Sequence, residues 1–214
     1  LGVAHAATLL SCGPQSYAIT SSKLDSSCII DLETSDQMGV GRGHYNTIIK
    51  EKLGWLQKNQ VLEIGEDESG LYVLNPLETS EGIKVIKIPR VECETIGEIS
   101  DACGGDGKGW YYLEYRTNRG QDRALFKAQG LQSSYYVGGV EMRIDGFLVN
   151  ETVSSEIVSG TDYRSSFLID NNLADYFNSN LPEGQTFIDP HQGTRIKVED
   201  VNDERVLIKV EFRT

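Results

Sequence analysis

The side chains best suited to acid–base or metal chemistry near neutral pH are the three histidines of the chain. His5 follows Gly2 by three residues in the apolar opening LGVAH. His44 stands at the start of a predicted helix, where we expect a capping or surface role, with the lining of an active-site cleft as the alternative. His191, in IDPHQGT, is expected in a turn. No Ser-His-Asp or Cys-His arrangement is indicated, because these spacings match no nucleophile motif.

The four cysteines fall as two local pairs, Cys12 with Cys28 and Cys93 with Cys103. Among the possible connectivities we predict these two disulfides, because each closes a short loop. The spacing is not C-x-x-C, which disfavours a zinc ribbon or a redox motif. Disulfides would indicate an oxidising compartment and a secreted protein, whereas four buried free thiols in a cytosolic protein are the alternative.

Three acidic segments, DLETSD (31–36), GEDESG (65–70) and EDVNDE (199–204), offer the carboxylate oxygens that calcium prefers. None has the D-x-[DN]-x-[DN]-G spacing of a calcium loop, so we expect solvated turns, with calcium binding as the alternative. The glycine-rich segments GVGRG (39–43) and GGDGKG (104–109) lack the spacing of phosphate-binding loops and are also predicted to be turns.

The composition is that of a folded protein, with 39% hydrophobic and 24% charged residues in a chain of 214. The formal net charge of −12 argues against a nucleic-acid partner or an anionic membrane surface. No apolar run approaches the ~20 residues that span a bilayer, so we expect no membrane insertion.

The first 56 residues are predicted to hold loops followed by one helix, in HYNTIIKEKLGWL (44–56). Asn46 is placed to cap this helix and Gly54 to end it. From about residue 57 the apolar residues recur with a period of two, which indicates strands. Strands are predicted in GLYVL (70–74), IKVIKI (83–88), GWYYLEYR (109–116), GGVEMRI (138–144), GTRIKVEDV (193–201) and VLIKVEF (206–212), and a short helical turn in NNLADYF (171–177).

These patterns predict a mainly β fold with a small α part. VNDE (201–204) is expected to form a hairpin turn, and the many short strands favour an antiparallel β-sandwich. Glu114 and Arg116 are charged residues flanked by aromatic ones in a predicted strand. We expect them to form a buried pair that fixes this strand against the first segment, a structural rather than a catalytic role.

Gly2-Val3-Ala4-His5 resembles the last part of the metzincin zinc motif H-E-x-x-H-x-x-G-x-x-H. In that motif two histidines one helical turn apart bind zinc, and the Glu between them is the general base. A glycine then turns the chain so that a third histidine reaches the metal. The resemblance implies that His5 is this ligand and Gly2 this turn. It also implies that Met38, in a Gly-flanked turn, lies beneath the metal, while Val40 stands where some metzincins have a tyrosine ligand.

Two longer segments carry a closer resemblance. TSDQMGVGRGHYNTIIKEKLGWL (34–56) looks like the gametolysin-type secreted zinc metallopeptidases, where a D-x-M-G turn precedes a helix ending in L-G-W-L. GWYYLEYRTNRGQDRAL (109–125) is similar to the region after the catalytic core of that family. The resemblance implies an extracellular zinc metalloendopeptidase that hydrolyses peptide bonds in protein or peptide substrates.

On this resemblance, residues 1–56 are the C-terminal part of a metallopeptidase catalytic domain, and residues 57–214 are a β-rich accessory domain. The H-E-x-x-H segment, with two zinc ligands and the catalytic Glu, is then expected just upstream of Leu1. The chain itself is therefore expected to be a truncated, inactive fragment without a general base. The alternative is a non-catalytic β-sandwich module for adhesion or binding, because one motif histidine cannot hold a catalytic zinc.

Overall fold

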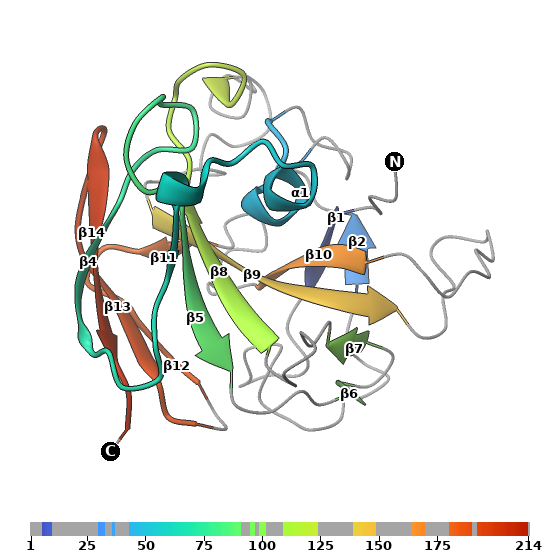
Figure 1. Ribbon diagram of the computed structural model, residues 1–214, viewed down its shortest axis with the longest axis vertical. Helices are drawn as coiled ribbons and strands as arrows, with labels where there is room; N and C mark the ends of the chain where they lie inside the picture. Colours follow the sequence, from blue (N-terminus) through green and yellow to red (C-terminus); the bar gives the residue numbers. More distant parts are fainter. Residues whose placement is uncertain are drawn as a thin grey trace.

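The computed structural model describes residues 6–9, 30–32, 36, 43–90, 95–96, 99–101, 109–123, 139–148, 164–169, 180–189 and 192–213. These residues form two β-sheets and one short α-helix, so the prediction of a mainly β chain with little helix is confirmed (Figure 1). No described helix is long and apolar enough to cross a membrane.

Within the described residues, the larger sheet has ten strands. Seven of them follow the order β2-β1-β10-β9-β8-β5-β3. Their bounds are β1 Ala6–Leu9, β2 Ile30–Leu32, β3 Val61–Glu63, β5 Val85–Arg90, β8 Gly109–Tyr115, β9 Gly139–Leu148 and β10 Arg164–Ile169. Three short strands complete the sheet: β7 (Ile99–Asp101) and β11 (Leu181–Pro182) pair with β9, and β6 (Thr95–Ile96) pairs with β7.

Most neighbouring strands are antiparallel, as predicted, but β1 pairs with β10 and β3 pairs with β5 in parallel. The alternation of apolar residues did not indicate these two pairings, since it says nothing about the direction of a neighbouring strand. β1 and β2 belong to the first 56 residues and share this sheet with strands from the rest of the chain. The division between residues 56 and 57 remains a prediction, and hydrogen-bonded strands join its two sides.

The smaller sheet has the order β12-β13-β14-β4, with β12 at Thr186–Ile188, β13 at Arg195–Asn202, β14 at Arg205–Glu211 and β4 at Gly70–Leu74. The predicted C-terminal hairpin is confirmed, because Asn202 pairs with Arg205 across its turn. Its alternation is confirmed too: Val206, Ile208 and Val210 are fully buried, while the residues between them are partly exposed.

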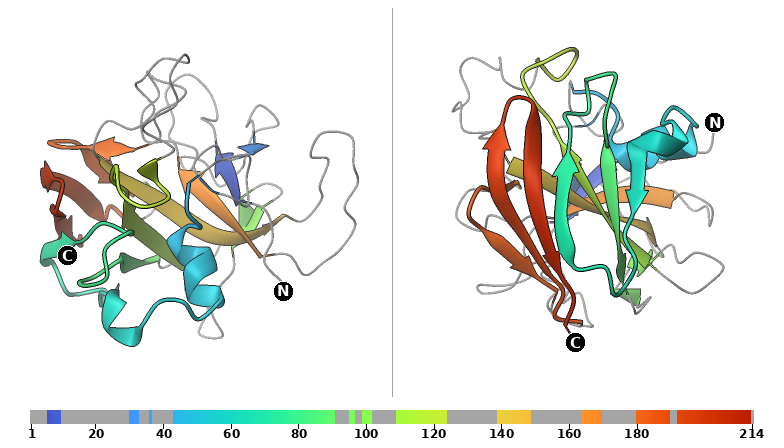
Figure 2. Two further views of the ribbon diagram at one scale, coloured as in Figure 1. Left: turned by 90° about the horizontal axis from the view of Figure 1, so that it is seen from above. Right: turned by 60° about the vertical axis from the view of Figure 1, so that its left-hand side comes forward.

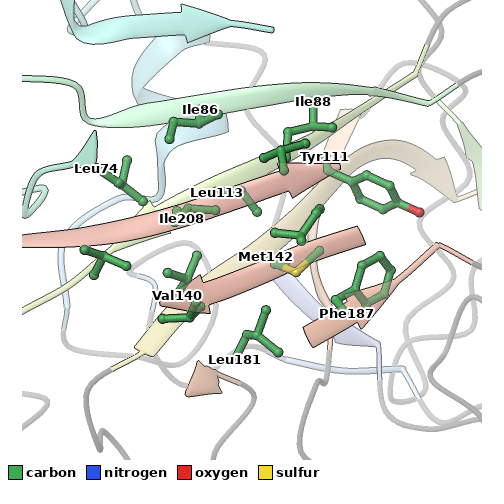
Figure 3. Packing of buried hydrophobic residues seen from close by; sticks show 14 of the residues in the cluster. Leu74, Ile86, Ile88, Tyr111, Leu113, Val140, Met142, Leu181, Phe187 and Ile208 are labelled. Carbon is green, nitrogen blue, oxygen red and sulfur yellow. The ribbon is translucent and has the colours of Figure 1, made fainter. Parts of the chain in front are cut away.

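The main hydrophobic core lies between the two sheets (Figure 3). The larger sheet contributes residues such as Ile88, Leu113 and Met142, and the smaller sheet contributes residues such as Phe187 and Ile208. Each of these side chains is fully buried, which is worth about 1.5–3 kcal/mol per large aliphatic residue. One continuous core therefore fixes the two sheets against each other.

Both faces of β8 are buried, which explains why GWYYLEY shows no simple alternation of polar and apolar residues. Tyr111, Leu113 and Tyr115 belong to the core between the sheets. Tyr112, on the opposite face, packs with Ile48 of the helix. The helix thus covers the face of the larger sheet that points away from the smaller sheet (Figure 2).

The helix α1 spans Thr47–Lys52, within the predicted segment. Asn46 caps it, since the side-chain oxygen accepts a hydrogen bond of 3.0 Å from the Ile49 N–H. At the other end the Gly54 N–H donates to Glu51 O and the Trp55 N–H donates to Lys50 O, the two bonds of a Schellman motif. Gly54 has φ +69°, so the role predicted for this glycine is confirmed.

The short 3₁₀-helix η1 (Lys58–Gln60) then leads into β3. The helical turn predicted at 171–177 lies outside the described residues.

Candidate functional site

The residues predicted to form the zinc site lie outside the described part of the chain. This applies to Gly2, His5 and Met38, to the predicted disulfide residues Cys12, Cys28, Cys93 and Cys103, and to His191. Among the described residues, no group of three or more His, Cys, Asp or Glu side chains is placed to hold a metal ion. Zinc, calcium and the two disulfides remain predictions. The structure does describe the segment that follows Met38, from Gly43 onward, and what holds it in place.

The first turn of α1 is held by carboxylates from other parts of the chain. The Asn46 N–H donates to a carboxylate oxygen of Asp36, which is fully buried. The Thr47 N–H donates to Glu114 Oε2 of β8 over 2.7 Å. Backbone N–H groups at the start of a helix have no partner within the helix, so these two carboxylates satisfy groups that burial would otherwise leave unpaired.

Arg116 lies at the centre of a cluster of charged groups. Its Nε is 3.0 Å from Glu114 Oε1, and its Nη1 is 2.9 Å from Asp122 Oδ1. The same Nη1 donates to the backbone carbonyl of His44 over 2.9 Å, and Nη2 is 4.0 Å from Asp36 Oδ2. One guanidinium group therefore binds β8, the turn after it and the segment before α1. The predicted buried pair of Glu114 with Arg116 is confirmed, and both residues contact the first segment as expected.

The neighbouring strand β9 adds a second arginine and a second glutamate. Glu114 and Glu141 are directly opposite each other on the two strands. Arg143 donates from Nε to Glu114 Oε1 over 3.0 Å and from Nη2 to Glu141 Oε2. Arg116 Nε also lies 3.2 Å from Glu141 Oε2. We call this set of Asp36, Glu114, Arg116, Asp122, Glu141 and Arg143 the buried ion cluster.

Side chains of the buried ion cluster are at most 1% exposed, so no dissolved substrate reaches them. Burial raises the pKa of the Glu141 carboxyl to about 8, even though Arg116 and Arg143 oppose the increase. For Glu114, burial also raises the pKa, but the attraction of Arg143 and Arg116 outweighs it and holds this pKa below its usual range. The pair therefore combines one protonated carboxyl and one carboxylate at neutral pH.

His44 lies at the open edge of this region and is half-buried. Its Nε2 is 3.9 Å from Glu78 Oε1, and the Lys50 ammonium is the same distance from that oxygen. Its backbone N–H donates to Asp122 Oδ1 over 2.7 Å. Burial lowers the pKa of His44, and the nearby Lys50 charge lowers it further. His44 is thus neutral at pH 7 and helps to join the start of α1 to two loops.

Four members of the buried ion cluster were not identified from the sequence: Asp36, Asp122, Glu141 and Arg143. A signal was present for the last two, because Glu-x-Arg occurs both in YLEYR and in VEMRI. Charges that alternate with apolar residues resemble the solvent face of a strand, so the pattern alone does not show burial. The Glu-x-Arg pattern becomes informative because it occurs on two strands. When these strands pair, the two glutamates lie opposite each other, and each arginine can bind the glutamate of the other strand.

Comparison of the chain with protein-family models, with curated proteins and with solved structures found no match.

Proposed function

We propose that this chain is part of a secreted zinc metalloendopeptidase of the gametolysin type, which hydrolyses peptide bonds in proteins. In this proposal His5 is one zinc ligand, Gly2 provides the turn that brings it to the metal, and Met38 packs beneath the site. A bound zinc would supply a polarised carbonyl and a water of lowered pKa. The proton of that water would pass to the Glu of an H-E-x-x-H segment, which the motif places before Gly2.

One observation supports the proposal above all. The two segments that carry the resemblance, 34–56 and 109–125, lie 75 residues apart between their starts, yet their charged residues meet in the buried ion cluster. Asp36 stands two residues before Met38, and Arg116 and Glu114 hold the segment that contains it. A metal site built on a turn requires that turn to be fixed, and the cluster holds Asp36 and the start of α1, the described residues on either side of the proposed turn.

The remaining part of the proposal concerns the β-rich region. Two sheets that share one core have the layers of a sandwich, and we propose that residues 57–214 act as a sandwich-like accessory domain of the peptidase. The secreted location rests on the two predicted disulfides.

The first test is the coding sequence upstream of Leu1, where the proposal requires an in-frame H-E-x-x-H. Absence of that motif contradicts the peptidase assignment. If it is present, the protein extended by that segment should bind zinc and cleave casein. His5→Ala should abolish both, whereas His191→Ala, a matched histidine outside the motif, should change neither.

A non-catalytic binding module is the second candidate, and one observation favours it. β4 forms an edge of the smaller sheet and carries the exposed apolar residues Leu71 and Val73. Exposed apolar side chains on a sheet edge are common at binding sites for other chains. This candidate predicts binding of a protein or peptide without cleavage.

A further inference from the structure

The edge strand β4 lacks the devices by which proteins usually block unwanted strand pairing. Among the described residues it pairs only with β14, which lies on one side of it (Figure 2). Its sequence, GLYVL, contains no charge and no proline, and its register with β14 is continuous over all five residues. Lysine, proline or a bulge normally protects such an edge, and within the described part of the chain β4 has none of them. The opposite edge strand, β12, has only three residues.

The outward-facing side chains of β4 are apolar. Leu71 is 61% exposed and Val73 is 38% exposed, whereas Leu74 is fully buried in the core. Leu207 of β14 pairs with Val73 and continues the apolar surface along the outer face of the sheet. A strand added beside β4 would cover these side chains with its own residues at alternate positions.

An acidic turn lies directly before this edge. Glu66, Asp67 and Glu68 are exposed and precede β4, and the chain as a whole carries a formal charge of −12. A segment that pairs with β4 and extends past Gly70 therefore runs beside three carboxylates. The charge favours a partner with lysine or arginine at that end.

A second copy of this chain fits the edge poorly. Two β4 strands paired edge to edge would join two molecules that each carry a formal charge of −12. The exposed apolar surface is two side chains on a strand of five residues, far below the ~800 Å² per partner of a stable dimer. An extended peptide needs less area, since main-chain hydrogen bonds provide much of its affinity.

We propose that β4 binds an extended peptide segment as an added strand, with alternate apolar residues over Leu71 and Val73 and a basic end beside residues 66–68. The site is independent of the proposed zinc centre, so it stands whether or not the chain belongs to a peptidase. In a peptidase this edge would be a second binding site for a protein substrate, in addition to the catalytic centre.

The test uses fluorescein-labelled peptides in which valine and threonine alternate and two lysines stand at one end. Both orientations of the sequence are tested, because the edge accepts a parallel or an antiparallel strand. Binding to the whole chain is followed by fluorescence anisotropy. One orientation should bind, and the same peptide with glutamates in place of the lysines should bind more weakly. N-methylation of the valine nitrogens and of the threonine nitrogens is tested separately; one set should abolish binding and the other should spare it, because alternate N–H groups point to opposite edges of a strand.

Protein variants locate the site. Leu71→Lys and Val73→Lys should each weaken binding by about tenfold or more, as expected for the loss of one buried aliphatic contact. Ile188→Lys is the matched control and should have no effect, because Ile188 lies on the opposite edge strand and its exposure is between those of Val73 and Leu71. Asp67→Lys should reduce the preference for the lysine peptide over the glutamate peptide. Thermal unfolding of each variant confirms that it is folded.

Two results would overturn the proposal. One is binding that neither set of N-methyl groups weakens, or that Ile188→Lys weakens as much as Leu71→Lys does. The other is a dimer in sedimentation experiments on the free chain that Leu71→Lys abolishes, because the edge would then belong to a second copy.

Discussion

Glu114 and Glu141 face each other across β8 and β9, and both carboxyl groups are buried beneath α1 and the segment that precedes it. Two carboxylates this close cannot both be ionised away from water without a large cost in free energy. Arg116 and Arg143 reduce that cost. The proton held by Glu141 reduces it further, because only one of the two carboxyl groups is then charged. The anchoring of the first segment to the sheet therefore depends on a bound proton.

Glu141 should make the stability of the protein decrease as the pH rises from about 4.5 to about 8, whereas His44, whose pKa is lowered, acts in the opposite sense below about 6.5. In this window the folded state keeps the proton of Glu141 while the unfolded chain has lost it, so each step up in pH favours unfolding. Glu114 acts in the opposite sense, because its lowered pKa means that stability is lost as the pH falls below about 4.5. Urea denaturation at several pH values measures both slopes.

Glu141→Gln should flatten the decrease between pH 4.5 and 8, since an amide mimics the protonated carboxyl and does not titrate. Glu211→Gln, at an exposed glutamate, is the control and should leave the slope unchanged. A slope that persists in Glu141→Gln would show that another group carries the proton.

Arg116→Met should destabilise the protein by about 3–5 kcal/mol, because it leaves several carboxylates buried without their partner. Arg195→Met removes an arginine from an exposed pair with Glu211 and should cost only about 0–1 kcal/mol. The free energies of unfolding come from urea titrations. Similar losses for the two variants would contradict the role assigned to the buried ion cluster.

The ends of α1 can be tested separately. Asn46→Ala should lower stability by about 1 kcal/mol through loss of the cap. Gly54→Ala should cost about 1–2 kcal/mol, and the cause is the backbone alone, since a Cβ at this position meets no atom within 4 Å. Gly54→Asn is the matched comparison: asparagine tolerates a positive φ, so its loss should be smaller than that of alanine. Equal losses would show that the conformation of residue 54 is not what matters.

Local patterns in the sequence predicted those features that depend on neighbours along the chain. The cap at Asn46, the stop at Gly54 and the hairpin before Val206 each need only a few adjacent residues, and all three are present. The parallel pairing of β1 with β10 joins residues about 160 positions apart, which no local pattern encodes.

Local patterns also did not predict the burial of the charged residues in the buried ion cluster. Glu141 and Arg143 alternate with apolar residues along β9. A strand with one solvent-exposed face has the same sequence pattern, so the pattern does not reveal that these charges are buried. Only the packing of α1 and its preceding segment over β8 and β9 makes that face part of the interior. The charged pairs can be recognised only when it is known that β8 and β9 are neighbours in the sheet.

The 214-residue chain alone should neither bind zinc tightly nor cleave peptides. Catalytic zinc sites use three protein ligands, and the motif supplies only His5. Calorimetric zinc titration and a casein-cleavage assay test this. Submicromolar zinc binding that His5→Ala abolishes, together with proteolysis, would mean that the remaining ligands come from residues outside the motif.

The disulfides should join Cys12 to Cys28 and Cys93 to Cys103. Proteolytic digestion without reductant, followed by mass spectrometry, identifies the linked peptides. Crossed pairs would contradict the predicted connectivity. Four thiols that react with a thiol reagent before unfolding would contradict both the disulfides and the argument for secretion.

The position of the buried ion cluster in the sequence also sets an order of events during synthesis. The segment with α1 leaves the ribosome before its anchors, because Glu114 and Arg116 follow Leu56 by 58 and 60 residues. At ~5–20 residues per second, this helix waits roughly 3–12 s for these anchors and for Tyr112, against which Ile48 packs. A six-residue helix is too short to persist alone. The segment with α1 is therefore made before it can fold, and its apolar face is open to chaperones in the meantime.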